Sequence, residues 1–420
     1  MSRCLPALLA LGLVTAPAPA GTMTVEFTVN AGDHARTNEP VTVTFTLPKE
    51  FAKVHTVALS RAKAVFGIGQ LTDPSLGSEE KAPEGKVIRE LHFILPSLAA
   101  KGSLDLRATL NTDEPEVKVD AAKLFKWTDT KGESAELDYG KTPVLRYMYK
   151  ALDNSSKEKR EETFKVYHHL FDPSGKRMVT KGVGGLYTHH RGIFYGFKDV
   201  TYDGDKKVDI WHCPVAYQAH EKFLASEEGP VLGRHRVLVA WHGKDEDIFA
   251  REERELTAYK LPGGTLIGFT SRLKTTGGPV KLDGDPQHSG FHFRADDEVS
   301  KKDVSAQTIF IRPAGVGEPG VELNWPKDKQ QVNLPWNAMS FVLGGQRYTA
   351  AYLDRPDNPK EARYSERTYG RFGSYFVTEV TKDKPLTVHY RLWLQEGQMK
   401  PEDVAAMDDV FVKPVTVTIK

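Results

Sequence analysis

The chain has 420 residues, of which 40% are hydrophobic, and its 57 Lys and Arg are balanced by 56 Asp and Glu. Balanced charge excludes broad nucleic-acid binding, which needs a basic surface to neutralise phosphates. The sequence has no apolar run of eighteen residues, which excludes an integral membrane protein.

The N-terminus has the pattern of an export signal. Arg3 supplies a positive charge, Leu5–Val14 form a short apolar stretch, and Ala18–Ala20 give an Ala-x-Ala cleavage site. We therefore predict a signal peptide over residues 1–20 and a periplasmic or extracellular protein, with an uncleaved anchor as the alternative. Cleavage leaves Cys213 as the single cysteine, which excludes an internal disulfide and is interpreted as a buried small hydrophobe rather than a ligand or nucleophile.

The first segment after the signal alternates apolar and hydroxyl residues with period two. The pattern is clearest over Thr24–Val29 and Val41–Leu47, and Pro, Gly, Asp and Asn fill the turns between such runs. Regular short strands of this kind predict a small accessory β-sandwich over residues 22–112. The acidic stretch 111–116 is interpreted as a linker.

The remaining residues, 125–420, are again dominated by strand patterns, several of them ten residues long. Long strands without intervening helices predict two large antiparallel sheets that stack face to face, so the predicted fold class is all-β. A helix is expected only over Pro401–Val410, where Pro401 suits the first turn. The predicted strands are 144–149, 164–171, 231–241, 249–259, 266–274, 338–343, 347–353, 375–380, 386–394 and 415–419.

Ionisable residues gather with glycine in five places, which are Tyr167–Gly175, Thr188–Gly196, Val208–His212, Asp283–Arg294 and Leu353–Pro359. Each lies at the end of a predicted strand or in a turn, where binding groups sit on a rigid scaffold. Satisfied core histidines, simple ion pairs and capped turns are the alternative interpretation of each segment.

Side-chain alternation predicts which of these residues share a face. In an extended strand His189 and Arg191 point the same way and His190 the other, and His292 and Arg294 also share a face. Asp209 and Trp211 share a face too, and an aromatic plane beside a carboxylate suits a sugar.

Several of these motifs, in their order along the chain, resemble the PmoA family of exported bacterial proteins over residues 140–400. The matching residues are His189-His190-Arg191-Gly192, Asp209-x-Trp211, Gly284-Asp285-x-x-His288-x-Gly290 with Arg294, and Asp354-x-Pro356-x-Asn358-Pro359 with Tyr369-Gly370. The resemblance implies a large β-supersandwich similar to the galactose-mutarotase-like fold. The family's label as a methane oxygenase belongs to an integral membrane protein and is a misnomer for this chain.

Three functions follow as hypotheses. The first is a carbohydrate-active enzyme in which His189 or His288 is the general acid or base and Asp285 or Asp209 its partner. Trp211 would stack on the sugar. The remaining predicted substrate-binding residues are Arg191, His292, Arg294, Asp354, Asn358 and Arg367.

The second hypothesis is a glycan-binding module without catalysis. The third is a metal-dependent enzyme in which His189, His190, His288 and His292 with Asp285 bind Zn, Fe or Cu. Because the sequence has no tight metal-ligand signature such as His-Glu-x-x-His, we predict no metal and no cofactor, and keep the third hypothesis as an alternative.

Overall fold

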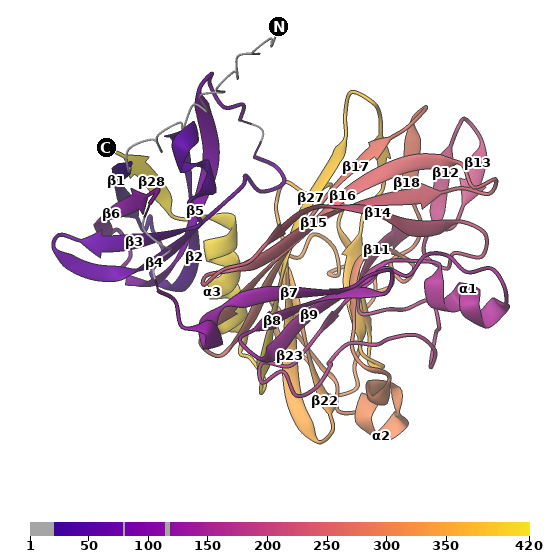
Figure 1. Cartoon of the computed structure of the whole chain (residues 1–420). Coiled ribbons are helices and arrows are strands. Elements are labelled where there is room, and N and C mark those ends of the chain that lie inside the picture. The colour runs from indigo at the N-terminus through magenta and orange to yellow at the C-terminus, as the bar shows by residue number, and fades with distance from the viewer. Residues whose placement is uncertain (1–20, 79, 114–117) are drawn as a thin grey trace, which may run out of the picture.

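A computed structural model describes residues 21–78, 80–113 and 118–420. The predicted signal peptide, residues 1–20, and most of the predicted linker lie outside these ranges. The described chain is built from antiparallel strands with a few short helices, which confirms the all-β prediction (Figure 1). None of its helices has the length and apolarity needed to cross a bilayer.

The N-terminal part forms one curled sheet. Phe27 and Phe45 come from strands far apart in the sheet order, yet their rings are 6.0 Å apart. The sheet therefore folds over on itself and encloses its own hydrophobic core. Its strands, in spatial order, are β2 (Arg36–Pro48), β5 (Lys86–Leu98), β4 (Ala64–Thr72), β3 (Thr56–Arg61), β6 (Ser103–Asn111), β1 (Thr22–Asn30) and β28 (Thr416–Ile419).

The C-terminal strand β28 belongs to this N-terminal sheet. It pairs antiparallel with β1, with Phe27 opposite Ile419, although residues 125–420 were predicted as one domain. Pairing of the two chain ends depends on tertiary contacts, which the alternation in residues 415–419 does not specify.

Two large sheets face one another and enclose the main core. Phe291 on one sheet lies 4.3 Å from the Phe269 ring and is stacked 4.7 Å from Tyr390 on the other. The eight-stranded sheet runs β24 (Arg363–Arg367), β25 (Arg371–Tyr375), β19 (Ser289–Arg294), β11 (Ile193–Phe197), β10 (Tyr167–Leu170), β9 (Thr142–Met148), β8 (Ser134–Tyr139) and β7 (Phe125–Thr130). The nine-stranded sheet runs β14 (Tyr217–Glu227), β15 (Gly233–His242), β16 (Ile248–Leu261), β17 (Gly264–Thr275), β27 (Leu386–Glu396), β23 (Gln346–Asp354), β22 (Trp336–Leu343), β20 (Ile309–Arg312) and β21 (Gly315–Val316).

A third, small sheet closes one end of the sandwich. Its strands are β13 (Lys206–Val208), β12 (Asp199–Tyr202), β18 (Val280–Asp283) and β26 (Thr378–Val380). One predicted strand, 375–380, is therefore divided between two sheets, because β25 ends at Tyr375 and β26 begins at Thr378. Another, 164–171, is shortened to β10, because Phe164 ends the preceding helix.

Helices are short and peripheral. The predicted C-terminal helix is confirmed as α3 (Pro401–Val412), whose Val404 and Phe411 pack on the outer face of the nine-stranded sheet. The sequence analysis missed α1 (Lys157–Thr163), a highly charged helix capped by the Ser156 side chain. The other helical turns are α2 (Lys302–Ser305), η1 (Lys49–Lys53), η2 (Ala121–Lys123) and η3 (Asp297–Ser300).

Buried polar contacts join the N-terminal sheet to the main sandwich. The Gln70 amide bonds to the main chain at residues 228, 231 and 232. Glu90 lies 3.5 Å from both His92 and Arg234, and all three side chains are buried. Burial opposes ionisation of Glu90, but hydrogen bonding and charge from His92, with the Arg234 charge, lower its pKa to about 2.

Candidate functional site

Three histidines from three separate loops converge beside the eight-stranded sheet. His189 precedes β11, His212 follows β13 and His288 precedes β19. The His212 ring centroid is 4.3 Å from that of His189 and 4.8 Å from that of His288. One ring nitrogen of each lies within 4.8 Å of the others, and all three side chains are half-buried. We call these residues the histidine cluster.

Two of the three imidazoles are held by the same local hydrogen-bonding arrangement. The Nδ1–H of His212 donates to Asp209 at 2.7 Å, and the Nδ1–H of His288 donates to Asp285 at 2.9 Å. Each aspartate is three residues before its histidine and also accepts a main-chain N–H, from Trp211 or Gln287. The turn thus fixes the carboxylate, and the carboxylate fixes the ring with Nε2 directed away from it.

The third imidazole, His189, is neutral. Burial, followed by the charges of Lys165, His212 and His288, lowers its pKa to about 2. Its Nε2 is buried and has no hydrogen-bond partner among the residues that the structure describes. Burial raises the pKa of Asp285, but the hydrogen bonds and charge of the His288 imidazole lower it by more. The pKa of Asp285 is therefore below its usual value, and this carboxylate is ionised.

A buried lysine connects two of the loops. The Lys165 ammonium donates to the carbonyl of His189 at 3.1 Å and to that of Trp211, beside His212. Burial lowers the pKa of Lys165 to about 8. Gly192 lets the loop that carries His189 pack closely against β10, because a Cβ at this position would lie 2.1 Å from the His168 carbonyl oxygen.

Four of the predicted substrate-binding residues lie near the cluster but are completely buried. Trp211 packs on Phe194 and His292, so it offers no open face on which a sugar could stack. The other three residues bond inside the protein: His292 with Arg371 and the Ser289 carbonyl, Arg294 with Asp297 and the Tyr369 carbonyl, and Arg191 with the Glu161 carbonyl.

The fifth predicted segment, Leu353–Pro359, lies outside the histidine cluster. Asp354 accepts from Asn358 at 2.6 Å and from Lys360 at 2.9 Å, and the Asn358 side chain also bonds to the His389 main chain. Arg367 forms an ion pair with Glu322 at 2.8 Å. None of these contacts involves the histidine cluster, so the structure does not bring Asp354, Asn358 or Arg367 into it.

Residues that the sequence analysis did not assign complete the site. They are His212 within the cluster, Lys165 behind it, and Arg371, Tyr369 and Tyr187 around it. The signal that finds His212 is the repeated Asp-x-x-His spacing at 209–212 and 285–288. His190, expected as an alternative metal ligand, instead packs its ring between Tyr187, Tyr369 and Phe194. Cys213 is buried, as predicted.

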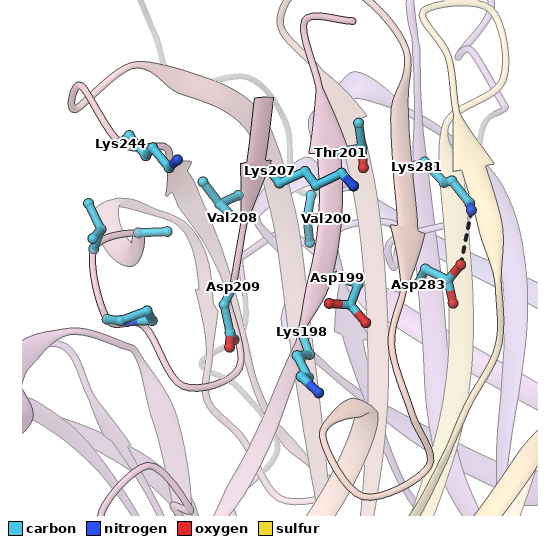
Figure 2. Close-up of a pocket in the computed structure, with 13 residues that line it drawn as sticks. Lys198, Asp199, Val200, Thr201, Lys207, Val208, Asp209, Lys244, Lys281 and Asp283 are labelled. Carbon is cyan, nitrogen blue, oxygen red and sulfur yellow. Dashed lines mark ion pairs between the residues drawn. The ribbon is translucent and has the colours of Figure 1, made fainter. Parts of the chain in front are cut away.

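A pocket of about 470 Å³ lies beside Asp209, the carboxylate that holds His212, and no histidine of the cluster is among its lining residues. Asp209, the partner of His212, and Lys198, which pairs with Asp285 at 3.2 Å, both line it. Figure 2 shows Lys207, Lys244 and Lys281 around one end of this pocket and Asp199, Asp209 and Lys198 around the other. The pocket is large enough for a small molecule. It is lined by one residue from each Asp-x-x-His turn's surroundings: Asp209, which holds His212, and Lys198, which pairs with Asp285.

Comparison with known proteins identifies the family. A family of unknown function, DUF6807, matches residues 134–408, which contain the whole histidine cluster. The chain belongs to the DUF6807 family. The resemblance to the PmoA family is thereby wrong, because the shared order of short His, Asp and Gly motifs did not discriminate between families.

Other comparisons add little to the DUF6807 assignment. A solved structure of a protein in the glycosyl hydrolase family 38 from Enterococcus faecalis is similar at 10% sequence identity and a TM-score of 0.44. The match covers 94% of this chain and 47% of that one, so this chain spans about half its length. A likeness at this level carries no argument about function. No curated protein matches.

Proposed function

We propose that the DUF6807 domain of this protein is a metal-dependent enzyme whose divalent transition metal is held by His189, His212 and His288. The observation that carries the proposal is the convergence of three imidazoles, two of them with Nδ1–H held by a carboxylate. Metal-binding histidines commonly donate their second ring nitrogen in this way, which fixes the ring and raises the basicity of the ligating nitrogen.

The distances suit a three-histidine site after small side-chain movements. Nitrogens bound tetrahedrally at about 2.1 Å lie roughly 3.4 Å apart. The cluster nitrogens lie within 4.8 Å of one another, so closing them on a metal requires shifts of about 1 Å, on the scale of side-chain adjustment. The neutral state of His189 removes the need to displace a proton when it binds.

Three protein ligands leave a coordination position open for water or substrate, as in catalytic rather than structural metal sites. A metal bound there would lower the pKa of a coordinated water and polarise a substrate oxygen. The protein's own residues supply the rest: Asp209 and Asp285 orient the ligands, and Lys165 fixes two of the loops. We propose hydrolysis or elimination at a polar substrate in the adjoining pocket.

Metal content tests the proposal. The purified full-length chain, reconstituted with Zn²⁺ and passed through a desalting column, should retain about one metal per chain. His189→Ala, His212→Ala and His288→Ala should each lose it, whereas His190→Ala should keep it, because His190 is adjacent but is not in the cluster. Equal retention by all four variants, or no stoichiometric metal in the parent protein, would overturn the proposal.

A carbohydrate substrate is the second candidate. Tyr187, which is 47% exposed, lies beside the cluster with its ring 5.1 Å from that of Tyr369, and its exposed ring offers the kind of face that sugar C–H groups use. Screening a panel of glycans by calorimetry, with reducing-end assays on the same samples, separates an enzyme from a binding module. Export of the protein remains a prediction from residues 1–20, and this substrate class agrees with it.

A further inference from the structure

Five buried cations surround the histidine cluster and its loops. They are Lys165, Lys181, Arg191, Arg294 and Arg371, each at most 5% exposed. Of these five cations, only Arg294 forms an ion pair with a carboxylate of the described residues, that of Asp297 at 3.1 Å. The two lysines and Arg191 donate to main-chain carbonyls, which carry no net charge.

Arg371 is the clearest case of a buried cation without a negatively charged partner. Its guanidinium contacts Nδ1 of His292 at 2.9 Å, the Ser365 hydroxyl at 3.0 Å and the Tyr369 hydroxyl at 3.2 Å. All three partners are neutral groups.

Buried polar atoms without a partner occur in the same region. They include both ring nitrogens of His190, Nε2 of His189, Nε1 of Trp211 and Nε of Arg294. Trp211 Nε1 and Arg294 Nε can only donate hydrogen bonds. Because buried donors in folded proteins are normally satisfied, the region has an excess of hydrogen-bond donors as well as of positive charge.

The local carboxylates do not balance these charges. Asp297 pairs with Arg294, and Asp209 and Asp285 add two negative charges, each already bonded to a cluster histidine, against the four other buried cations. A bound divalent metal would add two further positive charges. Burying unpaired charge is costly, so what this region lacks is a negatively charged ligand.

The adjoining pocket has the same bias. Lys281 pairs with Asp283 and Lys198 with Asp285, while Lys207 and Lys244 form no ion pair with any carboxylate in the described part of the chain. Asp199 and Asp209, the latter bonded to His212, are the other lining carboxylates, so four lysines face three aspartates in the pocket.

We propose that the substrate of the histidine cluster carries an anionic oxygen group, a carboxylate, sulfate or phosphate ester, placed between the cluster and the lysines of the pocket. This inference rests on the proposed function, because it takes the same cluster as the reaction site. It narrows a carbohydrate substrate to acidic or esterified sugars.

Calorimetry with matched sugars tests the inference. The Zn²⁺-reconstituted full chain at low ionic strength should bind D-glucuronate at least tenfold more tightly than D-glucose, and added NaCl should weaken that binding. Inorganic sulfate and phosphate, as separate titrations, show whether a tetrahedral anion is preferred to a carboxylate. Equal affinity for the two sugars, or no binding of any of the three anions at millimolar concentration, would overturn the inference.

Two variants locate the binding. Lys207→Ala/Lys244→Ala should weaken binding of the preferred anion about fivefold for each charge removed, the effect of a unit charge about 4 Å away in a water-like dielectric. Lys126→Ala, an exposed lysine on β7, is the matched control and should change nothing. An unchanged affinity in the double variant would contradict the assignment to this pocket.

The two proposals fail separately. Repeating the glucuronate and glucose titrations on metal-free protein distinguishes them. If the protein binds no zinc but still prefers glucuronate, the metal centre alone is overturned. If it binds zinc but does not prefer glucuronate, the anionic substrate alone is overturned.

Discussion

Replacing Asp285 with Asn tests the role assigned to the two Asp-x-x-His turns. The carboxylate lies 2.9 and 3.0 Å from Nδ1 of His288 and also accepts from the main chain of Gln287. An asparagine keeps an oxygen for both donors and removes the charge. The substitution therefore removes the charge that supports His288, together with the ion pair between Asp285 and Lys198.

The expected magnitude follows from the geometry. The carboxylate would stand about 7 Å from a metal on the far side of the ring, where a divalent ion and a unit charge interact by roughly 1–2 kcal/mol at an effective dielectric constant of about 40–80. The high dielectric constant is appropriate because the Asp285 side chain is 37% exposed. Zn²⁺ affinity should fall about 5- to 30-fold, which overlaps the range of roughly 10- to 100-fold known for residues that support metal ligands.

Competition with a chromogenic chelator measures this affinity. Asp283→Asn is the control, because Asp283 belongs to the same segment but pairs with Lys281 and touches no histidine of the cluster. Asp209→Asn should weaken binding by a similar factor, because Asp209 holds the His212 ring in the same way. Unchanged affinity in Asp285→Asn, or an equal loss in Asp283→Asn, would refute the role of the carboxylate.

Three further predictions concern stability, measured by urea unfolding. Because folding lowers the pKa of Glu90, its ionised form stabilises the protein above pH 4.5. The free energy of unfolding of the wild type should exceed that of Glu90→Gln by about 3 kcal/mol there, and this difference should disappear as pH falls from 4.5 to 2. A difference that stays constant with pH would contradict this. Gly192→Ala should cost about 2 kcal/mol or more, since its Cβ would meet the His168 carbonyl; wild-type stability would contradict this. Glu366→Gln should cost roughly 3 kcal/mol because it leaves the Arg312 charge in its buried site unpaired, and a loss below about 1 kcal/mol would show that the pair is weak.

Alternation along the chain predicted most of the long strands of the nine-stranded sheet, because each such strand has one face toward the core, but β14 (Tyr217–Glu227) was not predicted. The strand β11 was not predicted, since every residue of Ile193–Phe197 is buried and the period-two signal is absent. The pairing of β28 with β1 joins the two ends of the chain, which no local pattern specifies.

The candidate site was predicted in part. The segments carrying His189, Asp209 and the Asp285–His288 turn do converge, as the shared strand-end positions suggested. His212 belonged to the predicted segment Val208–His212 but was given no role in it, although it repeats the spacing of the Asp285 turn.

The segment with Asp354 and Asn358 had similar chemistry and a similar strand-end position, yet its groups bond to one another. Sequence shows that a strand ends in polar residues, and it does not show at which end of the sandwich that strand lies.

Anomalous diffraction from a crystal of the Zn²⁺-reconstituted protein tests the central claim most directly. The account predicts one strong peak at the zinc edge, about 2.0–2.1 Å from an imidazole nitrogen of His189, His212 and His288 and with Asp209 and Asp285 still bonded to Nδ1 of their histidines. No peak at the cluster, or a peak on other residues with the three imidazoles unmoved, would contradict it.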